Sequence, residues 1–102
     1  MKIRNFKKSD FTSVKSIYQQ GIYAPGSDSY WMGSIAMNDN GDIGLSYAKG
    51  SSATYMSLAY TGRLASDPLG TMPIAEVIAK AGSGSQTTMN RVGDYAQTCL
   101  DP

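Results

Sequence analysis

The sequence contains no histidine and only one cysteine, Cys99. Histidine is the commonest general base and the commonest metal ligand in proteins, so the chain lacks the usual residue for acid–base catalysis and for metal binding. A single cysteine cannot form a disulfide within the chain, and without a histidine partner Cys99 is better read as a small apolar residue than as a nucleophile. We therefore predict no catalytic residue and no cofactor.

Long hydrophobic runs are also missing. No stretch approaches the roughly 18 apolar residues of a membrane-spanning helix. The N-terminus carries charges at positions 2, 4, 7 and 8 but no apolar run behind them, unlike a secretory signal peptide. These two observations predict a cytoplasmic protein that does not associate with membranes.

Acidic residues are scarce at the start of the chain. Up to residue 24, five basic residues accompany one acid, Asp10, whereas from residue 25 onward four basic residues accompany seven acids. A basic terminus can bind nucleic acid, but five basic residues are more often a solvated surface, so we do not expect nucleic-acid binding. The opposite charge balance of the two parts favours a contact between subunits instead.

A length of 102 residues with 41% hydrophobic content predicts one folded domain over residues 1–102. Its first part, residues 1–24, is predicted to be a strand–helix segment. Residues 2–6 form the strand, Ser9 caps the helix, and the apolar spacing of Phe11, Val14 and Ile17 continues to a stop at Gly21.

The second part, residues 25–102, is rich in glycine and turn signals and predicts a blade of antiparallel β-strands. A hairpin turn is expected at residues 38–41, and the preceding strand should place Trp31, Ile35 and Met37 on one face. The predicted strands cover residues 30–37, 42–47, 55–60, 74–81 and 92–100. A lone sheet exposes its edges, so the predicted fold class is α+β, incomplete alone and completed by homo-oligomerisation.

Residues 1–22 resemble the start of a GNAT-type N-acetyltransferase. The resemblance lies in residues 3–11, followed by Val14, Ile17, Tyr18 and Gly21. However, the chain has no Arg/Gln-x-x-Gly-x-Gly/Ala loop that opens a helix, and such a loop would hold the pyrophosphate of acetyl-CoA. Acetyltransferase activity is therefore not expected.

Residues 26–102 resemble about one blade of a family of secreted bacterial β-propeller proteins that are sialidase-like. The motifs that carry this resemblance occur in the same order, at residues 31–37, 41–47, 60–63, 65–70, 82–86 and 90–95. The turn at residues 39–41 is similar to a sialidase Asp-box, although Met37 stands where that box has Ser or Thr. A propeller needs several blades, and this chain holds barely more than one.

A sialidase would need an arginine cluster, a Tyr/Glu nucleophile pair and an acidic Asp. The chain has three arginines, and Glu76 is its one glutamate. In a propeller these residues would be spread over separate blades. Glycosidase activity is thus not expected from one blade.

The candidate ligand-binding residues lie at predicted strand edges. They are Arg63, Arg91, Asp94, Tyr95 and Trp31. In one reading they form a polar ligand pocket; in the other the charged residues tie loops together through salt bridges and carbonyl contacts. Trp31, Tyr47, Tyr55 and Tyr60 can likewise form an aromatic surface for sugars or a partner, pair within the core, or face another subunit.

Two acids in the hairpin turn are the candidate metal ligands. Asp39 and Asp42 could offer oxygens to Ca²⁺, but the turn lacks the spacing and terminal Glu of an EF-hand. The competing interpretation is a turn stabilised by its own Asn and Asp side chains.

The predicted function is a non-enzymatic, oligomeric binding or interaction module whose ligand is a small molecule, a glycan or a protein. A chimeric chain of two gene fragments would suit a mobile gene cassette. The alternatives are a small glycosidase-like hydrolase with a site between subunits, and a recombination product with no selected function.

Overall fold

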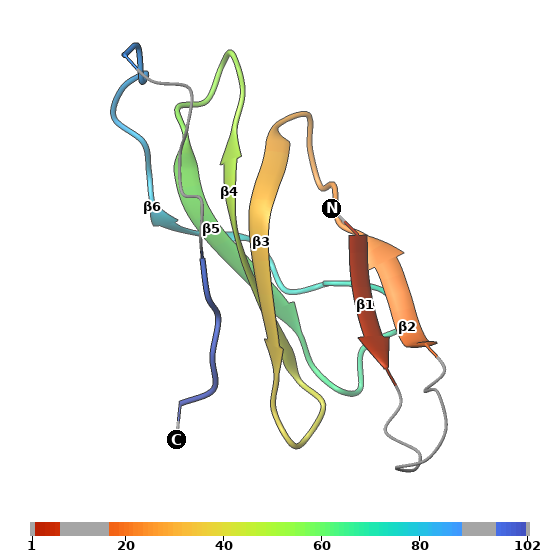
Figure 1. Ribbon diagram of the computed structural model, residues 1–102. Coiled ribbons are helices and arrows are strands. Elements are labelled where there is room, and N and C mark those ends of the chain that lie inside the picture. Colours follow the sequence, from red (N-terminus) through yellow and green to blue (C-terminus); the bar gives the residue numbers. More distant parts are fainter. Residues whose placement is uncertain (1, 7–16, 89–95, 102) are drawn as a thin grey trace.

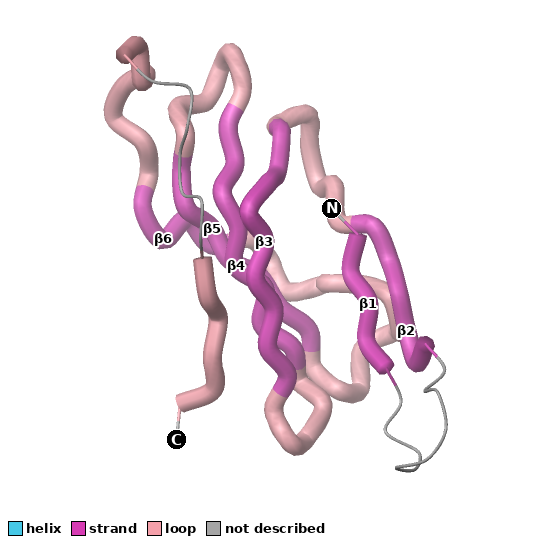
Figure 2. Tube along the Cα trace, viewed as in Figure 1, coloured by secondary structure: helices cyan, strands magenta, loops and turns pink. Residues whose placement is uncertain are grey.

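The structure, a computed structural model, describes residues 2–6, 17–88 and 96–101. All regular secondary structure in these residues is β-strand (Figure 2). The strands are β1 (Lys2–Phe6), β2 (Ile17–Ile22), β3 (Ser29–Met37), β4 (Ile43–Gly50), β5 (Ser57–Arg63) and β6 (Val77–Lys80). They form a small β1–β2 sheet beside a four-stranded sheet in the order β3–β4–β5–β6 (Figure 1).

The predicted α+β class is wrong for the described residues. The strand over residues 2–6 is confirmed as β1, but the expected helix is replaced at its C-terminal end by β2, which pairs antiparallel with β1. The rest of the expected helix, including Ser9, Phe11 and Val14, lies outside the described residues. A three-turn helix is marginal alone, whereas pairing with β1 gives the backbone of β2 hydrogen-bond partners at once.

Gly21 has a different role from the predicted helix stop. It lies within β2, opposite Ile3 of β1. A Cβ atom at this position would lie 2.1 Å from the carbonyl oxygen of Gly70. Glycine within a strand often marks such a close approach of two backbones. Gly21 thereby allows the small sheet to lie against the connection between β5 and β6.

The four-stranded sheet is an antiparallel meander with two distinct faces. Its inner face carries Leu45, Tyr47 and Ala59, which are buried, and its outer face carries Ser46, Leu58 and Tyr60. The predicted strands over residues 30–37, 42–47 and 55–60 are confirmed in the main, although β4 extends to Gly50 and β5 begins at Ser57 and extends to Arg63. Of the predicted strand over residues 74–81, only Val77–Lys80 is a strand, β6. The connection between β4 and β5 therefore starts at residue 51.

A β-bulge in β3 changes the predicted pattern of faces. Trp31 pairs with Ala48 and Ser34 pairs with Ser46, so one extra residue lies between them in β3. Met32 takes a φ of 53° at this point. Trp31 therefore lies on the outer face and Ile35 on the inner face, whereas simple alternation predicted one shared face.

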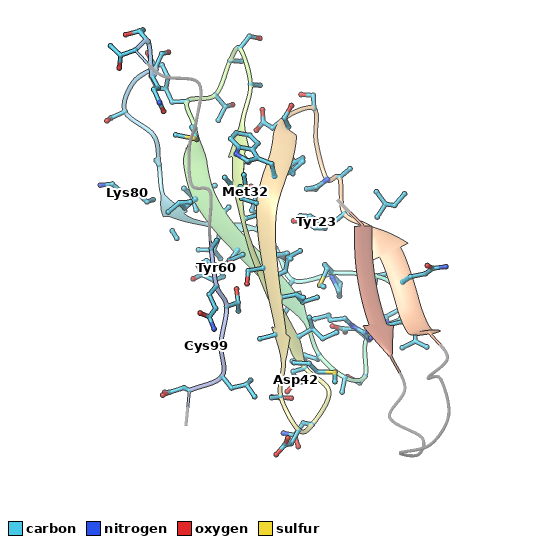
Figure 3. All side chains as sticks on the ribbon, viewed as in Figure 1. Tyr23, Met32, Asp42, Tyr60, Lys80 and Cys99 are labelled. Atoms are coloured by element: carbon cyan, nitrogen blue, oxygen red, sulfur yellow. The ribbon has the colours of Figure 1, made fainter. Side chains whose placement is uncertain are left out.

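The core lies on the inner face of the sheet. Tyr23, Leu45, Tyr47 and Ala59 form its buried cluster, with Tyr30 and Met72 packed against it. Tyr23 comes from the link after β2 and lies between the small sheet and the large one (Figure 3). The core thus joins the two parts of the chain that the sequence patterns distinguish.

The C-terminal segment, residues 96–101, crosses the outer face. The Thr98 amide donates a hydrogen bond to Ser34 Oγ (2.6 Å), and the Thr98 hydroxyl lies 2.6 Å from Ser46 Oγ. No strand is assigned to residues 96–100, so this part of the predicted strand over residues 92–100 is wrong. Ser34 and Ser46 on the outer face thus bind Thr98, and residues 96–100 do not pair with the sheet as a strand would.

Candidate functional site

Polar side chains meet on the inner face around Glu76, which precedes β6. One carboxylate oxygen of Glu76 accepts a hydrogen bond from the Tyr47 hydroxyl of β4. The other lies 2.5 Å from Lys49 Nζ, and Lys49 also lies 3.4 Å from an oxygen of Asp28. The hydroxyls of Tyr47 and Tyr23 are 3.2 Å apart. We call these five residues the Glu76 cluster.

The charges of the Glu76 cluster stabilise one another. Burial alone would raise the pKa of Glu76, but hydrogen bonds from Lys49 and Tyr47 outweigh it and leave that pKa below its ordinary value. The hydrogen bond to Glu76 in turn raises the pKa of Lys49. Both groups are therefore held in their charged forms as an ion pair.

Tyr47 is poorly suited to nucleophilic catalysis, although it forms a Tyr/Glu pair. The residue is 2% exposed, and burial, followed by the hydrogen bond to Glu76, raises the pKa of its hydroxyl well above the ordinary value. A nucleophile needs access and a more easily removed proton, and a general base works best near neutral pKa. The hydrogen bond and the ion pair of the Glu76 cluster instead hold β4 to the segment before β6.

Arg63 is the predicted ligand residue with the most unusual surroundings. It ends β5 on the inner face and is 2% exposed. Its guanidinium donates hydrogen bonds to the side-chain oxygen of Gln19 and to the carbonyl of Asp67. These contacts hold β5 to β2 and to the following turn. Carbonyl contacts that hold loops together were one of the two interpretations of Arg63 from the sequence. No salt bridge joins Arg63 to an acid of the described residues.

The other predicted ligand residues are not gathered around Arg63. Trp31 pairs with Ala48 on the outer face, so the sheet separates it from Arg63. Arg91, Asp94 and Tyr95 lie outside the described residues. Of the aromatic surface considered from the sequence, Tyr60 is on the outer face while Tyr47 is buried on the inner one.

The hairpin turn uses its acidic side chain for its own hydrogen bonds. Asp42 accepts bonds from Asn38 Nδ2 (3.0 Å) and from the Ala65 amide (2.8 Å). The amide of Asp42 donates to Asn38 Oδ1, and Gly41 takes a φ of 93°. Asp39 is exposed. Within the described ranges no three acidic or cysteine side chains are grouped so that they could hold a metal ion.

The outer face carries an exposed apolar patch. Leu58 is 57% exposed, Tyr60 is 47% exposed, and Val77, the partner of Tyr60 in β6, is 42% exposed. We call these three residues the outer patch. Tyr60 also lies in register with Ser46 and Ser34, the residues that hold Thr98. The C-terminal segment thus contacts β3 and β4, and the outer patch lies on β5 and β6.

A groove of about 290 Å³ runs between residues 22–25 and 70–72. Its lining includes Ile22, Tyr23, Pro25 and Met72 but no charged residue. Ligand pockets usually combine an apolar wall with a few converging polar groups. The groove has an apolar wall, but neither of the predicted ligand-binding residues Arg63 and Trp31 lines it.

Comparison with known proteins identifies no relative. No protein-family model, curated protein or solved structure matches the chain significantly. The resemblances to an acetyltransferase start and to a propeller blade therefore stay predictions. Among the described residues, no helix is long and apolar enough to cross a membrane.

Sequence reasoning missed two features of these sites. Gln19, an ordinary polar residue of the expected helix, is buried and accepts from both Arg63 and the Gly70 amide. The pairing of Tyr47 with Glu76 joins residues 29 positions apart, and no local pattern marks it. Both contacts depend on how the β5–β6 connection folds over the inner face.

Proposed function

We propose that this protein is a non-enzymatic interaction module that associates with a second copy of itself through the outer patch. The observation that carries the proposal is the exposure of Leu58, Tyr60 and Val77 on neighbouring strands of one sheet face. Contiguous exposed apolar side chains rimmed by polar ones often mark an interaction surface.

The neighbourhood of the outer patch supports a second copy as its occupant. The edge strand β6, which carries Val77 of the patch, is exposed at every residue, and an open edge favours pairing with another chain. An isologous contact would place patch against patch, with Lys80 at its rim. Lys80 lies opposite Leu58 at the far edge of the sheet (Figure 3).

The charge of the chain does not oppose self-association. The formal net charge is +1 at pH 7, so repulsion between two copies is weak. A low net charge promotes association of surfaces that are already apolar. A small-molecule or glycan ligand has less support, since the groove lacks charged groups and Trp31 stands apart from Arg63.

Light scattering coupled to size-exclusion chromatography tests this proposal. We expect the native chain to show a concentration-dependent rise in mass that Leu58→Lys abolishes. The matched control is Leu69→Lys, because Leu69 is 52% exposed but lies in the connection between β5 and β6. Equal loss of association in both variants, or a native chain that stays monomeric, would refute the proposal.

A further inference from the structure

The hairpin turn between β3 and β4 contains a chemically reactive dipeptide, Asn40 followed by Gly41. The backbone nitrogen that follows an asparagine can attack the carbon of its side-chain amide and close a small ring, a succinimide. Glycine has no Cβ to hinder this approach. Asn40 is exposed, so water reaches its side chain. The chain's other asparagines are each followed by a residue with a side chain, at positions 6, 39 and 91.

The closed turn keeps the attacking nitrogen engaged. The Gly41 amide donates a hydrogen bond to the Asn38 carbonyl (3.1 Å), and Gly41 takes a φ of 93°. A nitrogen whose proton is bonded in this way is not free to lose it, and a reaction of this kind needs its atoms held in a near-attack arrangement. The reaction therefore waits until the turn opens, and turns open locally without unfolding the whole chain.

Contacts between Asn38 and Asp42 hold the turn closed. Asn38 Nδ2 donates to a carboxylate oxygen of Asp42 (3.0 Å), and the Asp42 amide donates to Asn38 Oδ1 (2.9 Å). The Asn38 amide also donates to the Asp42 carbonyl (3.0 Å). These bonds lie on either side of Asn40 and Gly41, so they set how often the reactive pair is released.

We propose that Asn40 is a site of spontaneous deamidation and that the Asn38–Asp42 contacts control its rate. When the turn opens, the Gly41 nitrogen loses its proton and bonds to Asn40 Cγ. The bond between Cγ and Nδ2 of Asn40 breaks, and the amide nitrogen leaves as ammonia. Water then hydrolyses the succinimide at either of its carbonyl groups, which leaves aspartate or isoaspartate in place of Asn40.

The product carries a new negative charge between two existing ones. Asp39 and Asp42 lie on either side of the modified position, and like charges at short range repel one another. The modified turn should therefore close less firmly than the native one. The site belongs to the β3–β4 connection and the outer patch to β5 and β6, so the inference does not rest on self-association (Figure 1).

Incubation of the native chain at neutral pH, followed by peptide mapping with mass spectrometry, tests the proposal. We expect conversion at Asn40, with the other asparagines as internal controls. Asn38→Ala removes two hydrogen bonds to Asp42 and should speed conversion by at least about fivefold. The control Gln19→Ala removes a buried contact outside the turn and should keep the native rate. Equal acceleration by both variants would overturn the role of the turn.

A second measurement on the native chain covers the case in which Asn38→Ala does not fold. In guanidinium chloride the unfolded chain has no closed turn, so conversion at Asn40 should be at least about fivefold faster than in the folded chain. Equal rates in the folded and unfolded chains would overturn the proposal. Faster conversion at another asparagine, or none at Asn40 in the unfolded chain, would overturn it too.

Discussion

The guanidinium of Arg63 donates a hydrogen bond to the side-chain oxygen of Gln19, and this contact joins the last residue of β5 to β2. The same oxygen accepts from the Gly70 amide at 2.9 Å. Three separate parts of the chain therefore meet at one buried amide. The small sheet is held to the large one by this polar contact as well as by the core around Tyr23.

Gln19→Ala should lower the free energy of unfolding more than the replacement of an exposed polar residue would. It leaves Arg63 and the Gly70 amide without their shared acceptor, and a buried donor left unsatisfied costs about 1–3 kcal/mol. Urea unfolding measures the loss. The control is Gln20→Ala, because Gln20 is the adjacent, exposed glutamine of the same strand. Equal stability of the two variants would show that the Gln19 contact contributes nothing.

Gly21→Ala should separate the small sheet from the β5–β6 connection. The added methyl would lie 2.1 Å from the Gly70 carbonyl oxygen, and relieving such overpacking costs about 1–3 kcal/mol. Gly44→Ala is the control, since a Cβ there meets nothing within 4 Å. It should gain about 0.5 kcal/mol by restricting the unfolded chain. Urea unfolding that ranks the two variants in the opposite order would contradict this account of Gly21.

Acid should weaken the Glu76 cluster. The pKa of Glu76 is lower in the folded chain than its ordinary value, so its contribution is complete above that ordinary value and is lost as the pH falls through the lowered one. The free energy of unfolding of the native chain should therefore fall toward that of Glu76→Gln in this acid range. The control, Asp101→Asn, changes an exposed carboxyl and should follow the native curve. Parallel curves for the native chain and Glu76→Gln would contradict the ion-pair description.

The large sheet was predictable because its signals are local. Turn residues such as Asn38 and Gly41 punctuate alternating apolar runs, and the structure confirms a hairpin there. The bulge at Met32 was not predictable, because alternation of side chains carries no sign of one extra residue in β3. That single residue decides that Trp31 and Ile35 lie on opposite faces.

The strand β2 was missed because its apolar residues also fit a helical spacing. Ile17, Tyr18 and Ile22 are β-branched or aromatic, which suits a strand equally well. Pairing with β1 decides between helix and strand for residues 17–22. Such pairing cannot be seen in the local sequence pattern. For the candidate sites, sequence reasoning selected Arg63 but neither Gln19 nor the Tyr47–Glu76 contact, since both depend on tertiary packing.

The most direct test of self-association is an isotope-filtered nuclear Overhauser experiment on a mixture of labelled and unlabelled native chains. It records contacts between copies and assigns them to residues. We predict contacts from Leu58, Tyr60 and Val77 to the other copy, and none from the buried inner-face residues Leu45 and Ala59. Contacts that arise from another surface, or no contact between copies at any concentration, would contradict the proposed function.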